Sequence, residues 1–213
     1  MNRPRIVLAD DHRLVAEGLR SLLSVEFELV AVVEDGRALV EAARKLGPDV
    51  IVADITMPHL SGIEALAQLK QDNPAVRVVF LTMHPEVTYA RRALAAGAAG
   101  YVLKHSAPAE LIAAIRAALD GQTYVSPSVA GSIFRVMSEQ PDQVGGPELS
   151  LTPRQREILQ LLAEGRSAKE IGDALAISTR TVEFHKYQMM DRLDLHTNAE
   201  LVRFALKHGI AEI

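Results

Sequence analysis

The chain shows two different patterns of apolar and polar positions, one before and one after about residue 121. From residue 5 to residue 121, short apolar runs alternate with longer segments whose apolar residues recur at helical spacing. The runs read RIVLAD, ELVAVV, VIVAD, VRVVFLT and GYVLK. Continuous apolar runs are typical of strands that are covered on both faces. Five runs, each followed by a helical segment, therefore predict an α/β domain with right-handed crossovers and a five-stranded parallel sheet.

The pattern changes after Gly121. The stretch SPSVAGSIFRVMSEQ predicts one amphipathic helix at about residues 127–138, and QPDQVGGPELS predicts a flexible connection. From residue 150 onward, every segment has helical spacing. We therefore predict an α/β domain at 1–121, a connecting segment at 122–149 and a small all-α domain at 150–213.

Capping residues mark the starts of four helices in the last part. A hydroxyl residue followed three positions later by Glu or Gln can satisfy two backbone donors at a helix start, and proline suits the first helical position. Such starts occur at Thr152–Gln155 with Pro153, at Ser167–Glu170 and at Thr197–Glu200, and Ser178 can cap the helix TRTVEFHKYQMMDRL. The apolar positions predict a small core formed largely by Ile158, Leu162, Ile171, Leu175, Ile177, Val182 and Leu193.

Composition limits the class of protein without identifying it. The chain has 213 residues, of which 48% are hydrophobic and 23% are charged, as in ordinary soluble globular proteins. It contains no cysteine, which excludes disulfides, thiolate metal sites and cysteine nucleophiles. It has no apolar stretch of about 18 residues, and its start, MNRPRIVLADD, lacks the apolar part of a secretion signal. We therefore expect a cytoplasmic protein that has no membrane partner.

Charge by itself does not indicate a nucleic-acid ligand. The formal net charge is -4. Residues 1–149 carry 14 basic and 18 acidic residues, and residues 150–213 carry 9 of each. Neither part is basic overall, so a DNA-binding function must rest on local pattern.

Polar residues follow four of the predicted strands. Asp10 and Asp11 end the first run, Asp54 the third, Thr82 the fourth and Lys104 the fifth. The carboxyl ends of parallel strands meet at one edge, where such folds bind ligands. Alone, each residue has a structural interpretation, such as a helix cap, a strand end or a surface lysine. Together, three carboxylates repel one another unless a positive charge lies among them, and their oxygen atoms suit Mg²⁺.

Asp54 has the surroundings of a nucleophile. Met57-Pro58 turns the chain away after it, because proline disfavours a continuing helix or paired strand. A carboxylate beside Mg²⁺ and a lysine can attack a phosphoryl group and become an aspartyl phosphate. Mg²⁺ and Lys104 would neutralise the charge of the transferred group, and the hydroxyl of Thr82 could donate to a phosphoryl oxygen.

The ordered set of Asp10-Asp11, Asp54 in DITMP, Thr82 in FLT and Lys104 in GYVLK resembles the receiver domain of two-component response regulators, over about residues 4–121. The resemblance implies a flavodoxin-like strand order, 2-1-3-4-5. It also implies that Asp54 accepts phosphate from a phosphohistidine of a sensor histidine kinase. In this family pattern, Asp11, Asp54 and the backbone carbonyl of Thr56 would hold Mg²⁺, with Asp10 acting largely through water.

The same resemblance implies a switch. Thr82 would move toward the phosphoryl group and Tyr101 would follow by changing its rotamer, so that phosphorylation shifts a two-state equilibrium. Thr56 and His84 lie two residues after Asp54 and Thr82, at positions where the side chain tunes how fast the phosphate is lost.

The stretch SAKEIGDALAISTRTVEFH predicts a helix, a tight turn and a second helix, with the small residue Ala174 in the first helix. Residues 150–213 resemble the LuxR-type helix-turn-helix of NarL/FixJ response regulators. The resemblance implies that the helix from Thr179 to Leu193 enters the major groove of DNA, with Val182 facing inward. The predicted DNA-binding residues are Lys169, Thr179, Arg180, Thr181, Glu183, Phe184, Lys186 and Tyr187.

These residues differ in what they could contact. Arg180, Thr181 and Lys186 are candidate donors to phosphates or base edges, and Lys169 to a phosphate. Glu183 stands where some relatives have lysine; it could accept from cytosine N4 or contact no base. Tyr187 could contact a phosphate or pack on a sugar. A neutral module should bind weakly as one copy, so we expect a homodimer on two half-sites.

Four histidines fall in loops that we expect at the acidic edge: His12, His59, His84 and His105. Imidazoles there could bind a transition metal or make the lifetime of the phosphate depend on pH. The alternative is that they are ordinary solvated loop residues.

Together these features favour a phosphorylation-activated, DNA-binding transcriptional response regulator that uses Mg²⁺ and performs no catalysis beyond its own phosphotransfer and dephosphorylation. One alternative is a phosphohydrolase with an aspartyl nucleophile, but those enzymes have a second acid where this chain has Thr56. Another is a receiver that acts by docking proteins without binding DNA. Neither GxxxxGK[ST] nor GxGxxG occurs, which disfavours nucleotide-binding enzymes.

Overall fold

The computed structural model describes residues 3–106, 108–139 and 151–211. The chain forms two compact units, Met1–Glu139 and Gln140–Ile213. We describe each unit by itself. No helix in the described ranges is long and apolar enough to cross a membrane.

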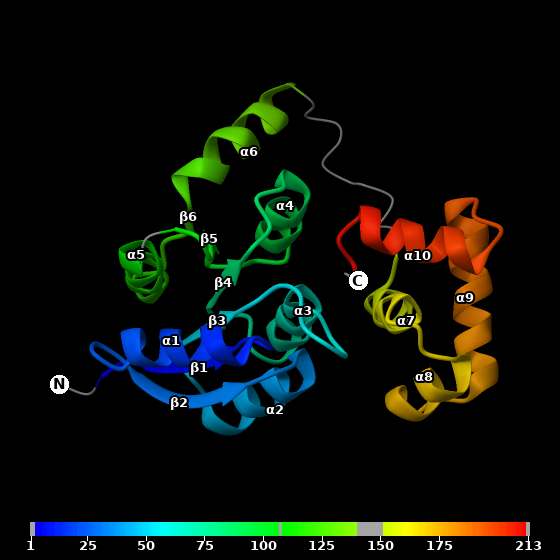
Figure 1. Cartoon of the computed structure of the whole chain (residues 1–213), viewed down its shortest axis with the longest axis horizontal. Coiled ribbons are helices and arrows are strands. Elements are labelled where there is room, and N and C mark those ends of the chain that lie inside the picture. Colours follow the sequence, from blue (N-terminus) through cyan, green and yellow to red (C-terminus); the bar gives the residue numbers. More distant parts are fainter. Residues whose placement is uncertain (1–2, 107, 140–150, 212–213) are drawn as a thin grey trace. The chain divides into compact units, whose positions relative to one another are not determined.

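The first unit is built on a parallel sheet in the order β2-β1-β3-β4-β5-β6 (Figure 1). Its first five strands confirm the predicted order and parallel direction. A sixth strand was not predicted, because two residues are too short to show a periodic pattern. The strands are β1 (Arg5–Ala9), β2 (Glu28–Val33), β3 (Val50–Ala53), β4 (Val78–Thr82), β5 (Gly100–Leu103) and β6 (Tyr124–Val125).

Helices cover both faces of this sheet (Figure 1). Along β1 and β3, alternate residues enter two separate apolar cores, which explains why these runs are continuously apolar. One core packs α1 and α5 against the sheet, and the other packs α2, α3 and α4 against the opposite face. The helices are α1 (Arg13–Leu23), α2 (Gly36–Leu46), α3 (Gly62–Asp72), α4 (Val87–Ala95) and α5 (Pro108–Leu119).

The segment after α5 continues the first unit. β6 pairs with β5, and the predicted helix is present as α6 (Pro127–Glu139). Val129 and Ile133 of α6 are buried in the same core as Tyr101. These contacts extend the first compact unit to Glu139. The flexible connection predicted up to residue 149 lies outside the described residues from 140 onward.

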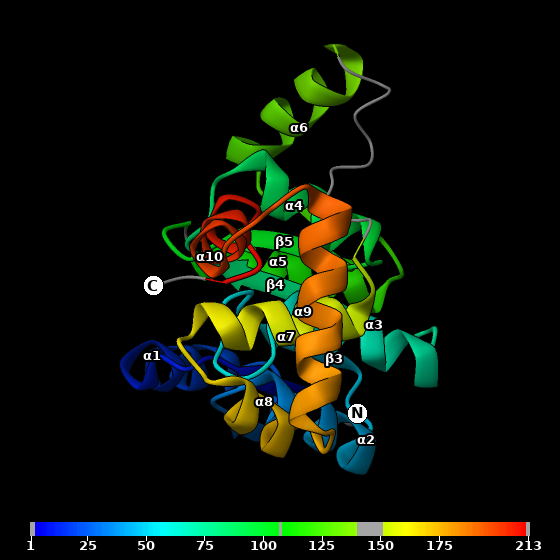
Figure 2. The same cartoon turned by 90° about the vertical axis from the view of Figure 1, so that its right-hand side faces the viewer.

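The second unit contains α7 (Pro153–Ala163), α8 (Ala168–Leu175), α9 (Thr179–Leu193) and α10 (Asn198–Lys207) (Figure 2). All three predicted capping boxes are formed, at Thr152, Ser167 and Thr197, and the Ser178 side chain accepts from the Thr181 amide. Of the predicted core residues, Ile158, Ile171 and Val182 are buried, and the others pack against them partly buried: Leu162, Leu175, Ile177 and Leu193.

The turn between α8 and α9 requires a small residue at Gly172. A Cβ atom there would lie 2.8 Å from the carbonyl oxygen of Ile177. The sequence analysis named Ala174 as the small residue of this helix. In the structure, Gly172 is the position at which the backbone of the turn approaches α8. Ala176 ends α8 in the left-handed region, with φ of 53°, so the chain reverses before Ser178 caps α9.

Candidate functional site

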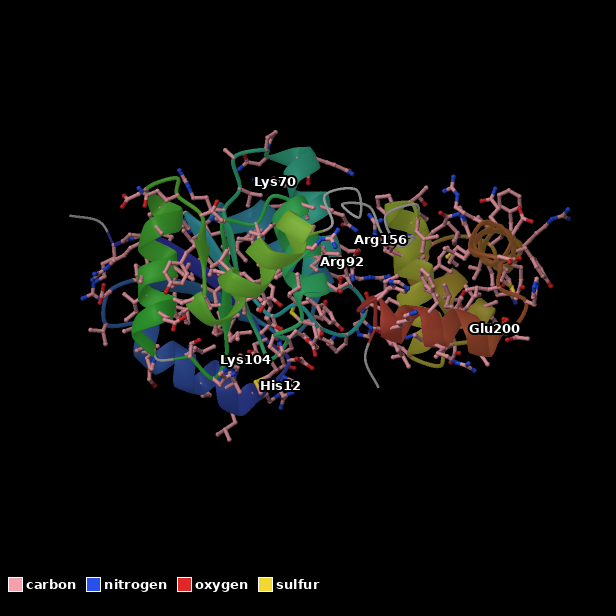
Figure 3. All side chains as sticks on the ribbon, turned by 90° about the horizontal axis from the view of Figure 1, so that it is seen from above. His12, Lys70, Arg92, Lys104, Arg156 and Glu200 are labelled. Atoms are coloured by element: carbon pink, nitrogen blue, oxygen red, sulfur yellow. The ribbon has the colours of Figure 1, made fainter. Side chains whose placement is uncertain are left out.

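The polar residues that follow the strands meet at one edge of the first unit. The Nζ atom of Lys104 lies 2.6 Å from Oδ2 of Asp54 and 2.7 Å from Oδ2 of Asp10. Asp10 and Asp54 are buried, and the Lys104 side chain is 8% exposed. Figure 3 shows Lys104 near His12, which begins the segment leading into α1. The lysine therefore joins the ends of β1, β3 and β5.

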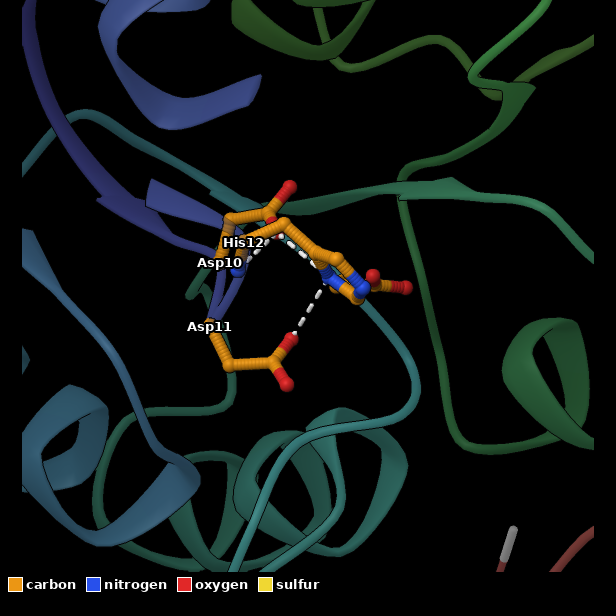
Figure 4. A group of neighbouring side chains, drawn as sticks. Asp10, Asp11 and His12 are labelled. Carbon is orange, nitrogen blue, oxygen red and sulfur yellow. Dashed lines mark hydrogen bonds and ion pairs between the residues drawn. The ribbon is translucent and has the colours of Figure 1, made fainter. Parts of the chain in front are cut away.

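Three carboxylates and one imidazole surround the same small space. Asp10, Asp11, His12 and Asp54 each offer a ligand atom, and these atoms all lie within 4.8 Å of one another. The Nδ1 atom of His12 lies 3.3 Å from Asp10 and 3.0 Å from Asp11 (Figure 4). Oδ1 of Asp11 is buried, and Nδ1 of His12 lies 3.0 Å from it. Three carboxylates so close together repel one another, and their oxygen atoms are the ligands that a divalent cation prefers.

Burial and the positive charge of Lys104 act in opposite directions on the pKa of Asp54. Burial raises the pKa of Asp54 above its ordinary value, and the neighbouring Asp10 raises it further. Lys104 and the amide of Ile55, which donates to Oδ1 at 2.6 Å, lower this pKa but do not cancel the rise. Burial alone would lower the pKa of Lys104, yet Asp54 and Asp10 outweigh it and raise that pKa. The lysine is thus held as a cation.

The loop after Asp54 is anchored to the protein interior. The side chains of Ile55, Met57 and Leu60 are buried, so the backbone turns without exposing apolar groups. The amide of Gly62 donates to the carbonyl of Ile55 at 2.8 Å, and α3 begins there. A Cβ atom on Gly62 would lie 2.1 Å from the carbonyl oxygen of Asp54. This close approach requires glycine and fixes the backbone that carries Asp54.

A second group of contacts joins the segments after β3 and β4 to Tyr101 of β5. The hydroxyl of Thr56 lies 3.0 Å from Nε2 of His84, whose ring stacks on Tyr89 at 4.0 Å between centroids. The backbone of His84 donates to the Thr82 hydroxyl at 3.3 Å and accepts from the Tyr101 hydroxyl at 2.7 Å. Tyr101 is buried, and this burial raises the pKa of its phenol. Thr82 and Tyr101 are therefore connected through one peptide segment.

The four loop histidines have different surroundings. His12 joins the acidic group, and His84 bonds Thr56. His59 is partly exposed and has a left-handed φ of 68°, and His105 is exposed. Among the described residues, His12 is the one histidine placed with a group of possible metal ligands.

The sequence did not reveal the role of Ser126. This fully buried serine donates to Oε2 of Glu110 at 2.6 Å, and its backbone amide donates to the carbonyl of Tyr101 at 2.9 Å. Its carbonyl accepts from Val129 and Ala130, so it begins α6. The one available sequence signal was a serine directly before Pro127, which is typical of a helix start. The structure shows that this start is attached to β5.

In the second unit, the predicted DNA-binding residues fall into two groups. Phe184 and Tyr187 are exposed by 58% and 64%, and Lys169, Thr179 and Arg180 are also exposed. The others are partly buried and engaged: the hydroxyl of Thr181 lies 2.8 Å from that of Ser178, and Lys186 lies 2.5 Å from Glu183. Val182 faces inward, as predicted.

The fold and the charged edge together define the class of protein: a flavodoxin-like domain with a buried carboxylate, lysine and hydroxyl at its strand ends, followed by a helix-turn-helix module. Comparison with known families agrees. Residues 6–116 match the family described as the response regulator receiver domain. Residues 149–205 match the bacterial regulatory proteins of the luxR family.

Individual relatives cover between 64% and 97% of the chain. The transcriptional regulatory protein MctR of Rhizobium johnstonii is 38% identical over 208 residues, which cover 97% of this chain and 94% of that protein. A crystal structure of a LuxR-family two-component response regulator from Aurantimonas sp. SI85-9A1 is 39% identical, covering 64% of this chain and 99% of that one, with a TM-score of 0.62. RcsB of Salmonella enterica serovar Typhimurium, bound to promoter P1flhDC in the presence of the phosphomimetic BeF3-, is 28% identical, covering 95% and 98%, with a TM-score of 0.64.

The chain therefore belongs to the response regulators that combine a receiver domain with a luxR-family DNA-binding domain. It is a transcriptional response regulator and not a member of a classical enzyme family. The sequence-based expectation of both family and fold is confirmed.

Proposed function

We propose that Asp54 is the phosphoacceptor and that its phosphorylation controls DNA binding by the second unit. The observation that carries this proposal is the contact of Lys104 with both Asp54 and Asp10. Lys104 favours the ionised, nucleophilic form of Asp54, while the Ile55 amide holds one of its oxygens at 2.6 Å. In the transfer, an Asp54 oxygen forms a bond to phosphorus as the bond from phosphorus to the donor histidine nitrogen breaks.

The acidic group fits Mg²⁺. Asp11 and Asp54, with the carbonyl of Thr56, would hold the ion, and Asp10 would act largely through water. The fit is supported by the ligand atoms, which all lie within 4.8 Å of one another, and by the three carboxylates, whose oxygen atoms suit Mg²⁺. Bound Mg²⁺ would neutralise charge on the transferred phosphoryl group. Lys104 would move from the carboxylates toward the new phosphoryl oxygens.

The switch is supported by the contacts of His84. A phosphoryl group on Asp54 would attract the Thr82 hydroxyl, which now accepts from the His84 amide at 3.3 Å. The carbonyl of the same residue accepts from Tyr101. Movement of Thr82 would thus disturb the bond that holds Tyr101, whose own carbonyl accepts from Ser126 at the start of α6. Phosphorylation at Asp54 can in this way shift the equilibrium of β5 and α6.

For DNA, we propose that α9 enters the major groove. Arg180, Thr179 and Lys169 are exposed and can donate to phosphates or base edges. Thr181, Glu183 and Lys186 would first have to leave the contacts that engage them. Because residues 150–213 carry no net charge, a phosphorylated homodimer on two half-sites would supply the affinity that one copy lacks. RcsB has been described as two dimers bound to two parallel DNAs.

The phosphoacceptor is tested with acetyl phosphate and Mg²⁺, followed by intact mass. The wild-type protein should gain one phosphoryl group per chain, and Asp54→Asn should gain none. Asp120→Asn, an exposed carboxylate beyond α5, is the control and should behave as wild type. Equal incorporation by wild type and Asp54→Asn would show that the site assignment is wrong. The proposed kinase partner is tested by phosphoryl transfer from a phosphorylated sensor histidine kinase. The wild-type protein should accept the group, and Asp54→Asn should not.

DNA binding is tested by gel shift of genomic fragments with the phosphorylated and unphosphorylated protein. We expect sequence-specific binding that phosphorylation strengthens. Phosphorylation without any specific DNA complex would instead favour a receiver that acts by docking proteins.

A further inference from the structure

Two large aromatic rings are exposed on one side of α9. Phe184 and Tyr187 are exposed by 58% and 64%, and a spacing of three residues places them on the same side of α9. Within the second unit, Figure 2 shows α9 (orange) in front of α7. The Phe184 ring makes an edge contact to the ring of its neighbour His185, with centroids 5.9 Å apart. Paired rings that a small module leaves exposed indicate a binding surface.

The two charged residues beside these rings neutralise each other. Glu183 lies 2.5 Å from the ammonium of Lys186, and that ammonium is 5.3 Å from the centroid of the Tyr187 ring. The Lys186 side chain is 13% exposed. This turn of α9 therefore offers apolar ring surface and no net charge. Arg180, one turn earlier, is an exposed cation of the same helix.

The chemistry of this surface suits one feature of the major groove. Thymine is the base that presents an apolar group there, its C5-methyl, and phenylalanine can contact it. We propose that Phe184, flanked by Tyr187, recognises thymine methyl groups, so that each half-site has a thymine where it meets Phe184. This inference rests on the proposed DNA-binding function of α9.

A second copy of this chain is the competing occupant. Two aromatic side chains bury at most about 250 Å² each, whereas a stable protein interface buries about 800 Å² per partner. The rings also share their helix with Arg180 and Thr179, which suit phosphates and base edges better than a protein core. The surface therefore favours DNA.

The experiment uses the full-length phosphorylated protein. A random-sequence duplex pool is selected for binding, and each thymine of the enriched duplex is then replaced singly by deoxyuridine, which removes the methyl group and keeps the base pairing. Dissociation constants are measured at one fixed salt concentration. We expect about fourfold weaker binding at one position of each half-site, the effect of one buried methyl group.

Variants at position 184 test whether Phe184 causes the difference between thymine and deoxyuridine duplexes. Phe184→Ala should bind the thymine and deoxyuridine duplexes equally, and Phe184→Leu should keep part of the difference. Val25→Ala, which removes an apolar side chain 71% exposed in the first unit, should keep the wild-type difference and serves as the control.

Three results would overturn the inference. In the first, no single deoxyuridine weakens binding by the wild-type protein. In the second, Phe184→Ala retains the full difference between the two duplexes. In the third, Phe184→Ala converts a dimer of the DNA-free protein into a monomer in sedimentation, which would assign the rings to a second copy. If the pool yields no enriched sequence at all, the proposed DNA-binding function fails and this inference fails with it.

Discussion

The hydroxyl of Thr56 and the Nε2 atom of His84 lie 3.0 Å apart, joining the loop after Asp54 to the loop after Thr82. The His84 ring is held from its other side by stacking on Tyr89. This contact spans the ends of two neighbouring strands beside the proposed phosphoacceptor. If this contact limits the access of water to a phosphoryl group on Asp54, its loss should speed hydrolysis of the aspartyl phosphate.

We therefore expect His84→Ala to shorten the lifetime of the phosphorylated protein. Loss of one hydrogen bond of about 1 kcal/mol corresponds to an increase of about fivefold in the rate of phosphate loss. Decay of the phosphoprotein, followed by intact mass after removal of the phosphodonor, measures it. Thr56→Val should act in the same direction, and the double variant should add little more. A lifetime unchanged in both single variants would show that the bridge does not limit access.

Lys104→Met should destabilise the first unit when no divalent cation is present. The substitution leaves Asp10 and Asp54 buried without their common cation, and breaking such a pair costs about 3 kcal/mol. Urea unfolding at pH 7 measures the change. Mg²⁺ should restore more stability to this variant than to the wild type, because it replaces the missing positive charge. An equal effect of Mg²⁺ on both proteins would contradict the proposed ion site.

Ser126→Ala should weaken the attachment of α6. The variant loses the donor to Glu110 and leaves that carboxylate without the bond, at a cost of about 1 to 2 kcal/mol. Ser128→Ala changes an exposed serine two residues later and should be neutral, so it is the matched control. Urea unfolding compares the two variants. Amide hydrogen exchange should in addition show faster exchange in α6 for Ser126→Ala alone.

Gly62→Ala and Gly18→Ala should have opposite effects on stability. A Cβ atom on Gly62 meets the carbonyl oxygen of Asp54, so we expect a loss of about 2 kcal/mol and impaired phosphoryl incorporation. Gly18 is an exposed position within α1 with no atom near its Cβ, so alanine should stabilise the helix by about 0.8 kcal/mol. Thermal unfolding and incorporation from acetyl phosphate test both. Normal incorporation in Gly62→Ala would contradict the role of the close approach.

The second unit should lose stability in acid through its capping boxes. Hydrogen bonds from the Ser167 hydroxyl and amide lower the pKa of Glu170, and those from the His196 and Thr197 amides lower that of Glu200. A folded pKa below the unfolded one stabilises the protein above the unfolded pKa, and this contribution is lost as the pH falls through the folded value. The loss should therefore occur below about pH 4.5.

Glutamine at both positions keeps a capping side chain but cannot titrate. The variant combining Glu170→Gln with Glu200→Gln should show a flatter acid dependence of unfolding than the wild type, followed by circular dichroism between pH 3 and 7. The exposed Asp173→Asn, on the same helix as Glu170, is the control. Parallel curves for the glutamine variant and the wild type would show that the two caps do not titrate with folding.

The sequence by itself determined the helices, the first five strands and the order in which they follow one another along the chain. Capping residues such as Ser167 and Glu170 act within one helical turn, and apolar spacing acts within a few residues, so neither depends on distant parts of the chain. The sequence also indicated that Asp10, Asp54 and Lys104 would meet, because parallel strands end at the same edge. The membership of these three residues in the candidate site therefore follows from their positions at the ends of parallel strands.

The tertiary structure alone decided which atoms touch. Lys104 contacts Asp54 across 50 residues and Asp10 at the same time, and His84 meets Thr56 across 28. The strand β6 has two residues, too few for a pattern, and it forms because β5 offers an edge to pair with. Ser126 is likewise an ordinary serine until β6 places it against Glu110 and Tyr101. Such contacts depend on strand register and side-chain direction between distant segments, which are established only when the sheet and helices pack together.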